Sequence, residues 1–190
     1  MKKIWIAIAI FAVCAMSLRA GAQVSPSATR SQLSVTAGAL GSVFQPDYGG
    51  GGVAATAPNR LYGVGAFVDV RFSRWVQIEA EGRWLRWNKF VDIYQDNYLI
   101  GPRVPIMHIG RVTPYGKFLF GMGKMNFEYS STHCRCTDLV YGGGADVQLT
   151  KRLSWRAVDF EYQQWPSWYV LQNGELHPYG VSTGIGYRIF

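Results

Sequence analysis

The chain has 190 residues, which is enough for one domain and excludes two domains of ordinary size. Aromatic residues make up 15% of it and there are 22 glycines, a combination that suits strands with ring-lined surfaces and close backbone approaches. The formal net charge of +7 falls to +4 without the basic N-terminal segment, an excess too mild to indicate nucleic acid and better suited to anionic lipid headgroups.

The N-terminal segment has the pattern of a secretory signal peptide. A basic start, Met1-Lys2-Lys3, precedes an uncharged apolar run over 4–16 and the small-residue cleavage site Ala20-Gly21-Ala22. The apolar run is shorter than the roughly 20 residues that a membrane-spanning helix needs. We therefore predict that residues 1–22 are a signal peptide and that residues 23–190 form the mature domain.

The mature part alternates apolar and polar residues with the period of a β-strand. Val64, Ala66 and Val68 share one face of such a segment, whereas Phe67 and Asp69 share the other. Recurring segments of this kind, separated by turn residues, predict an all-β fold of eight antiparallel strands. We place them near 32–41, 61–72, 75–87, 97–107, 114–127, 140–149, 153–165 and 178–190.

The expected connections alternate in length. Short turns at 73–74, 108–113 and 150–152 would lie at one rim, and longer loops at 42–60, 88–96, 128–139 and 166–177 would lie at the other. This layout is typical of an outer-membrane barrel, whose short turns and termini face the periplasm. A soluble barrel of the lipocalin kind also alternates, with its apolar face inward, so alternation alone does not decide between the two.

Two residue patterns favour the membrane barrel. Charges of both signs follow the polar face, where a narrow interior would let them pair: Asp69, Arg71, Glu79, Glu81, Arg83, Arg103, Lys117, Asp146, Asp159 and Glu161. Aromatic residues gather toward strand ends, where they would form two interfacial girdles: Tyr62, Phe72, Trp75, Trp84, Trp87, Tyr98, Tyr115, Phe127, Trp155, Tyr162, Trp165, Tyr179 and Tyr187.

The C-terminal strand is expected to run to the last residue, Phe190. A terminal phenylalanine resembles the C-terminal recognition signal of outer-membrane barrels, which the barrel-assembly machinery binds. In strict alternation Tyr187 and Ile189 share a face and Phe190 falls on the other. A slip at the final residue would place it with the other apolar side chains.

Five segments of the expected strands have a characteristic order and spacing. They are Asn97-Tyr98-Leu99-Ile100-Gly101-Pro102-Arg103, Arg111-Val112-Thr113-Pro114-Tyr115-Gly116-Lys117, Phe120-Gly121, Gly142-Gly143-Gly144-Ala145-Asp146 and Leu153-Ser154-Trp155-Arg156-Ala157-Val158-Asp159. Together they resemble the OmpA-like outer-membrane β-barrel superfamily, described as the outer membrane protein beta-barrel domain, over most of residues 61–190.

The resemblance implies an eight-stranded, antiparallel, up-and-down transmembrane β-barrel over residues 23–190, located in the cell outer membrane. It implies insertion by the barrel-assembly machinery and contact with outer-membrane lipids and lipopolysaccharide, but no single activity. We expect a monomer with no nucleic-acid partner. Because the sequence ends with the barrel, we expect the periplasmic peptidoglycan-binding domain of full-length OmpA to be absent.

Cys134 and Cys136 are the candidate metal ligands, together with the adjacent His133. These three residues share one expected loop, and they lack a fourth ligand and the usual spacing of a zinc site. We therefore expect a disulfide or paired thiols and no metal or cofactor.

An outer-membrane enzyme acting on lipid A would need a serine, a histidine and an orienting acid within hydrogen-bond reach. His108 lies at a predicted turn, His133 lies beside Ser130 and Ser131, and His177 lies near Glu175, which makes the last pair the best candidate. No family motif surrounds any of them, so we predict no catalytic residues and no enzymatic activity.

Two other roles remain open for the barrel. Its charged interior predicts a plugged lumen rather than a channel, although inward glycines would leave some room for a small pore: Gly63, Gly65, Gly101, Gly121 and Gly123. Aromatic residues in the longer loops would suit a structural or surface-interaction role, which we favour: Tyr48, Phe90, Tyr94, Trp168 and Tyr169.

Overall fold

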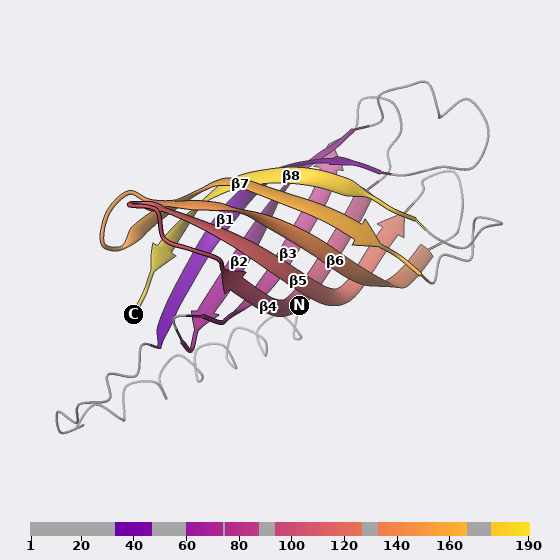
Figure 1. Cartoon of the computed structure of the whole chain (residues 1–190). Helices are drawn as coiled ribbons and strands as arrows, with labels where there is room; N and C mark the ends of the chain where they lie inside the picture. The colour runs from indigo at the N-terminus through magenta and orange to yellow at the C-terminus, as the bar shows by residue number, and fades with distance from the viewer. Residues whose placement is uncertain (1–32, 47–59, 74, 88–93, 127–132, 167–175) are drawn as a thin grey trace, which may run out of the picture. The chain divides into compact units, whose positions relative to one another are not determined.

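The computed structural model describes residues 33–46, 60–73, 75–87, 94–126, 133–166 and 176–190 (Figure 1). In this part of the chain no helix is long and apolar enough to cross a membrane. The described residues form eight strands: β1 (Ser34–Gln45), β2 (Leu61–Arg71), β3 (Gln77–Trp87), β4 (Tyr94–Pro105), β5 (Val112–Asn126), β6 (His133–Gln148), β7 (Leu153–Gln164) and β8 (Tyr179–Arg188).

Each strand pairs antiparallel with the next along the chain, and β1 pairs antiparallel with β8, so that the sheet closes into a barrel. The predicted eight-stranded, up-and-down antiparallel barrel is therefore confirmed. The signal-peptide prediction for residues 1–22 falls outside the described residues.

Strict alternation of burial along the strands separates two faces of the sheet. In β2, Val64 and Val68 are exposed on the outside, whereas Phe67 and Asp69 are buried inside. In β3, Glu79, Glu81 and Arg83 are buried in the same way. The two faces predicted for these strands are correct because successive side chains of a strand point to opposite sides.

The strand boundaries differ from the prediction mainly in β1 and β6. β1 continues to Gln45, which pairs with Tyr179 of β8. β6 begins at His133, where a loop was predicted up to residue 139, and its first residue pairs with Asn126 of β5. The first part of β6 carries polar residues such as Asp138, which points into the barrel, so it lacks the apolar pattern that reveals a strand.

The C-terminal strand also differs from the prediction. β8 ends at Arg188, and the backbone N–H of Ile189 donates to the carbonyl of Val35 at 2.8 Å. The side chains of both Ile189 and Phe190 are exposed, at 51% and 70%. The strand therefore does not run to the final residue, and the period-two alternation stops before it.

The connections alternate in length as predicted. Three short ones, over 72–76, 106–111 and 149–152, lie at the rim where β1 begins and β8 ends, which we call the short-turn rim (Figure 1). Gly110 has a φ of 61°, a conformation that glycine adopts without steric cost. The strand ends that are joined by the four longer connections, over 46–60, 88–93, 127–132 and 165–178, lie at the opposite rim, which we call the long-loop rim.

Candidate functional site

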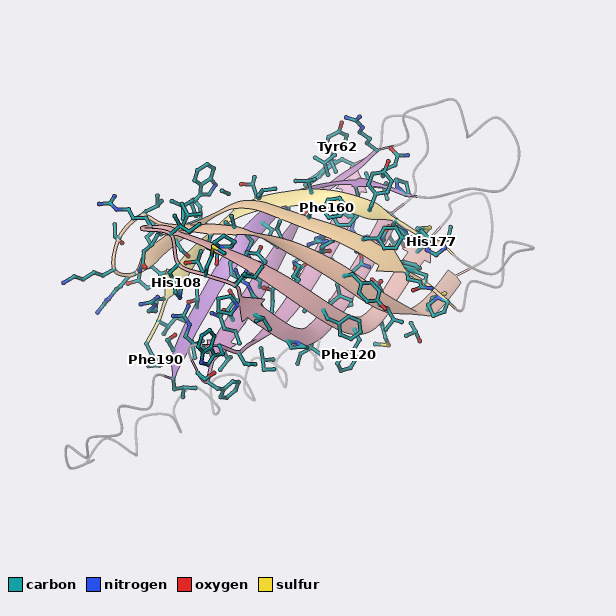
Figure 2. All side chains as sticks on the ribbon, in the orientation of Figure 1. Tyr62, His108, Phe120, Phe160, His177 and Phe190 are labelled. Carbon is teal, nitrogen blue, oxygen red and sulfur yellow. The ribbon has the colours of Figure 1, made fainter. Side chains whose placement is uncertain are left out.

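The outer face of the barrel is a continuous apolar surface. Tyr62, Phe120 and Phe160 point away from the barrel in Figure 2, at 38–51% exposure. The predicted aromatic residues that are exposed on this face are Tyr62, Phe72, Trp75, Trp87, Tyr98, Trp155, Tyr162, Tyr179 and Tyr187. A face of this composition suits contact with lipid, flanked by rings at the interfaces.

Two of the predicted girdle residues lie inside the barrel instead. Tyr115 is 3% exposed and Trp165 is fully buried. Tyr115 packs under the guanidinium of Arg103, whose Cζ lies 3.6 Å from the ring centroid. The aromatic composition of a strand end therefore does not fix the face on which a ring lies. Phe127 lies outside the described residues.

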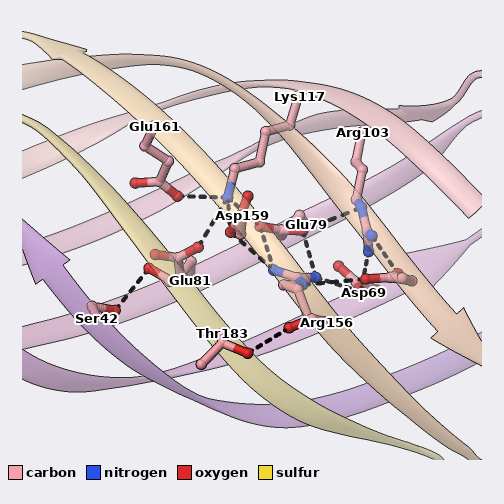
Figure 3. A network of polar contacts seen from close by, with 12 residues as sticks. Ser42, Asp69, Glu79, Glu81, Arg103, Lys117, Arg156, Asp159, Glu161 and Thr183 are labelled. Atoms are coloured by element: carbon pink, nitrogen blue, oxygen red, sulfur yellow. Dashed lines mark hydrogen bonds and ion pairs between the residues drawn. The ribbon is translucent and has the colours of Figure 1, made fainter.

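The inner face holds a cluster of paired charges, which we call the lumen network (Figure 3). Nine of its members were predicted to point inward, and most of the network is fully buried. Its strands of origin are β2 to β7, so it ties six strands together across the interior. The residues are Asp69, Glu79, Glu81, Arg83, Arg103, Lys117, Asp146, Arg156, Asp159 and Glu161.

Lys117 lies at the centre of the lumen network. Its Nζ donates to Glu161 at 2.5 Å and to Asp159 at 2.6 Å, both on β7. It also reaches Glu79 at 3.2 Å and Glu81 at 3.4 Å, both on β3. One ammonium group thus bridges four carboxylates from opposite walls.

The register of the sheet leaves space for the Lys117 side chain to reach the four carboxylates. It pairs with Gly142 of β6, where an added Cβ would come within 3.1 Å of the lysine Cε. Glu79, Glu81 and Asp159 bring their oxygens within 4.8 Å of one another, a spacing that could hold a metal ion. Nζ of Lys117 already contacts all three, so a resident side chain supplies the positive charge there.

Arg83 forms the end of the network nearer the long-loop rim. Its Nη1 and Nη2 donate to the two carboxylate oxygens of Glu161 at 2.5 and 2.9 Å, a bidentate arrangement. It also forms an ion pair with Glu81, and its guanidinium lies 4.5 Å from the ring centroid of Phe44. The charge is therefore both neutralised and covered by an aromatic face.

Arg103 and Arg156 form the other end of the network. Nη1 of Arg103 donates to Asp69 at 2.6 Å, and its Nη2 pairs with Asp146. Nη2 of Arg156 donates to Asp69 and to Glu79, each at 3.0 Å. Asp69 therefore accepts from two guanidinium groups at once.

The sequence pattern did not place Arg156 in the interior. Counting alternately back from Asp159 puts Arg156 on the lipid side, but a β-bulge between these two residues turns both inward. The hydroxyl of Thr183 donates to the carbonyl of Arg156 at 3.0 Å at the bulge. The inward position of Arg156 could have been predicted from the free-energy cost of placing an arginine against lipid.

Amide, aromatic and apolar side chains, together with the carboxyl group of Asp138, fill the lumen toward the long-loop rim. Nε2 of Gln95 donates to Gln163 at 3.0 Å, and Nδ2 of Asn97 donates to Asp138 at 2.5 Å. Beyond these amides lie the indole of Trp165 and an apolar cluster of Phe44, Leu61 and Leu85.

The room expected beside the inward glycines is occupied. A Cβ at position 123 would overlap the ring of Trp165. The indole therefore packs at this point only because residue 123 is a glycine. At Gly63, Gly65, Gly101 and Gly121 an added Cβ would instead collide with the backbone carbonyl of a neighbouring strand. The glycines therefore permit close packing of the strands and of Trp165.

Two of the histidines proposed as catalytic candidates, His108 and His177, lie at opposite ends of the barrel (Figure 2). His108 is exposed at the short-turn rim, with its Nδ1 2.9 Å from the hydroxyl oxygen of Thr113. His177 lies at the opposite end of the barrel (Figure 2), where it stacks on Tyr162 with ring centroids 5.7 Å apart. The side chain of His133 and the residues Ser130, Ser131 and Glu175 lie outside the described part.

The cysteine segment is strand rather than loop. Cys136 is buried on the inner face of β6 and is disulfide-bonded. The side chain of Cys134 lies outside the described residues, so the pairing of these two cysteines stays a prediction.

A closed sheet with an apolar outer face and paired charges inside defines the class of transmembrane β-barrels. The chain matches the outer membrane protein beta-barrel domain family over residues 7–188 and belongs to that family. Its location is accordingly the cell outer membrane, where the short turns of such barrels face the periplasm.

Solved structures support the same fold. Neisserial surface protein A matches with a TM-score of 0.62 and 10% identity, over 82% of this chain and 96% of that one. The N-terminal barrel of Pseudomonas aeruginosa OprF gives 0.55 and 16%, over 82% and 97%. The outer membrane protein AlkL gives 0.50 and 13%, over 87% and 94%. A comparison with curated proteins finds no match.

Proposed function

We propose that the protein is a monomeric, non-enzymatic barrel with a structural or surface-interaction role. The lumen network is the observation that carries this proposal. An eight-stranded barrel has an interior just wide enough for side chains to fill, and here charged side chains from six strands fill it. A solute could cross only if several buried ion pairs separated together.

The long-loop rim supports the surface-interaction part of the proposal. Arg86 at the end of β3 lies over the ring of Tyr94, with Cζ 4.5 Å from the ring centroid, and pairs with Asp96 at 2.7 Å. These contacts fix an aromatic and polar edge where the long loops begin. The other loop aromatics, Tyr48, Phe90, Trp168 and Tyr169, lie outside the described residues. Lipopolysaccharide is the partner that we propose for this rim.

Planar-bilayer recordings test whether the lumen is closed. We expect the native protein to show little or no conductance, because the buried pairs block the path. Lys117→Ala, which removes the central ammonium, should increase conductance over the native value. Large, stable channels from the native protein would contradict the proposal.

Mass spectrometry of lipid A tests the enzyme alternative. Lipid A from cells with and without the protein should be identical. A modification that is present with the native protein, absent with His177→Ala and retained with His108→Ala would show that the barrel is an enzyme.

A further inference from the structure

A group of cations surrounds the opening of the lumen at the short-turn rim. We call it the basic mouth, and define it as Arg71, Lys151, Arg152 and Arg188. Arg71 pairs with Ser34 across β1 and β2, and Arg188 pairs with Thr36 across β1 and β8, so that β1 lies between the two. The N–H of Arg188 donates to the carbonyl of Arg152 at 2.7 Å, which fixes the turn with Lys151 and Arg152 beside β8.

The basic mouth has no carboxylate partner among the described residues. The carboxylates nearest to it along the lumen, Asp69 and Asp146, are bound by Arg103 and Arg156. Within the described part, no ion pair to a carboxylate involves any of its four cations. Its positive charge is therefore not compensated by a direct ion pair within this part of the barrel.

Arg71 is held in place although it faces other cations. With the Gln77 amide turned so that its oxygen faces Arg71, that oxygen accepts from Nε and Nη2 of Arg71, each at 3.0 Å. Arg71 is also within electrostatic range of two cations, Arg188 and Arg103, and of two carboxylates, Asp69 and Asp146. Both carboxylates are already bound by Arg103 and Arg156. Like charges brought together in this way repel, and a bound anion would relieve that repulsion.

A cavity of about 60 Å³ lies between these residues. Arginine and lysine offer only donors, and the hydroxyls of Ser34, Thr36, Thr113 and Ser154 add further donors to the lining. The lining also includes the carboxylates of Asp69 and Asp146, whose charges are compensated by the guanidinium groups of Arg103 and Arg156. This volume holds about four water molecules, since each needs roughly 10–15 Å³ by the same measure. The cavity thus suits a small group that accepts hydrogen bonds on several sides.

We propose that the basic mouth binds a phosphate-type oxyanion, either free phosphate or the headgroup phosphate of an anionic phospholipid. Guanidinium groups bind phosphate oxygens in pairs with matched geometry, and Arg71 and Arg188 face the cavity from both sides of β1. This inference does not depend on the role proposed for the long-loop rim.

Binding measurements on the full-length mature protein in zwitterionic detergent test the proposal. Calorimetry with inorganic phosphate at physiological ionic strength forms one arm, and native mass spectrometry with phosphatidylglycerol forms the other. The test variant is Arg71→Gln/Arg188→Gln. A second variant, Lys151→Gln, changes only an exposed turn and leaves the barrel wall intact. Arg111→Gln is the matched control, because Arg111 lies at the same rim but does not line the cavity.

We expect saturable binding in at least one arm. The double variant should weaken it about tenfold or more, since two charged donors are lost. Lys151→Gln should weaken it by a smaller factor, and Arg111→Gln should leave it within about twofold, as screening makes exposed charges outside a site contribute little. Binding in one arm only identifies the source of the phosphate. Absence of binding in both arms, or an equal loss in Arg111→Gln, overturns the proposal.

Discussion

Lys117 shows how one residue organises the lumen. It contacts two carboxylates of β3 and two of β7. All five groups are fully buried, so their charges must be compensated within the interior. Removing the ammonium would leave the four carboxylates with only the guanidinium groups of Arg83, Arg103 and Arg156 as partners.

Lys117→Met should therefore be strongly destabilising. We expect a loss of about 3–5 kcal/mol in the free energy of unfolding, the usual cost of removing one partner of a buried ion pair. Urea unfolding of the protein in lipid vesicles measures it. Lys124→Met is the matched control, because Lys124 lies on the same strand and is only half-buried. Similar losses in the two variants would show that the network does not stabilise the barrel.

Gly123 provides a second test at the scale of single residues. Its Cβ position lies within the ring of Trp165, whereas nothing lies within 4 Å of the Cβ position at Gly116 on the same strand. Gly123→Ala should cost about 1–3 kcal/mol through overpacking, and Gly116→Ala should be close to neutral. Near-ultraviolet circular dichroism and urea unfolding measure both. Equal stability of the two variants would mean that the indole does not fill this part of the lumen.

At the scale of elements, the bulge in β7 decides which side chains point inward. Asp146 of β6 pairs with Arg156 and Ala145 pairs with Val158, so Ala157 is the extra residue. Deleting Ala157 would restore regular alternation and still leave Arg156 and Asp159 on the inner face. Deleting Phe160, three residues after Ala157, would move the side chains on one side of the deletion to the opposite face of the sheet.

We therefore expect the Ala157 deletion to fold and insert, and the Phe160 deletion to fail. Heat-dependent migration in gel electrophoresis, which separates folded barrels from unfolded chains, gives the readout. Failure of both deletions to the same extent would contradict the role assigned to the bulge.

The elements also show what sequence can predict. β2 and β3 alternate without interruption, so their bounds and faces follow from the sequence almost to the residue. The start of β6 was missed because its inward residues are polar and its pattern resembles a loop. Arg156 was missed because a bulge breaks the count, and Tyr115 and Trp165 were misplaced because aromatic composition does not report direction. The ion-pair partners depend on barrel closure, which local patterns do not encode.

At the scale of the whole molecule, the barrel has three regions of different chemical character. The apolar outer face suits lipid, the lumen network fills the interior with paired charges, and the basic mouth presents cations without a direct carboxylate partner at the short-turn rim. The closed sheet makes this division possible, because every strand contributes alternate residues to the outside and the inside. The central claim is therefore that the apolar face contacts lipid while the charged face is shielded from both lipid and bulk water.

Methyl NMR of the native protein in lipid nanodiscs tests this claim directly. A paramagnetic label on the lipid chains should broaden the methyl signals of Ile100 and Val181, which are 47% and 46% exposed on the outer face. It should leave those of Leu119 and Val140, which are fully buried inside, much less affected. A water-soluble paramagnetic reagent should broaden neither pair. Broadening of Ile100 and Val181 by the water-soluble reagent, or equal broadening of both pairs by the lipid label, would contradict the account.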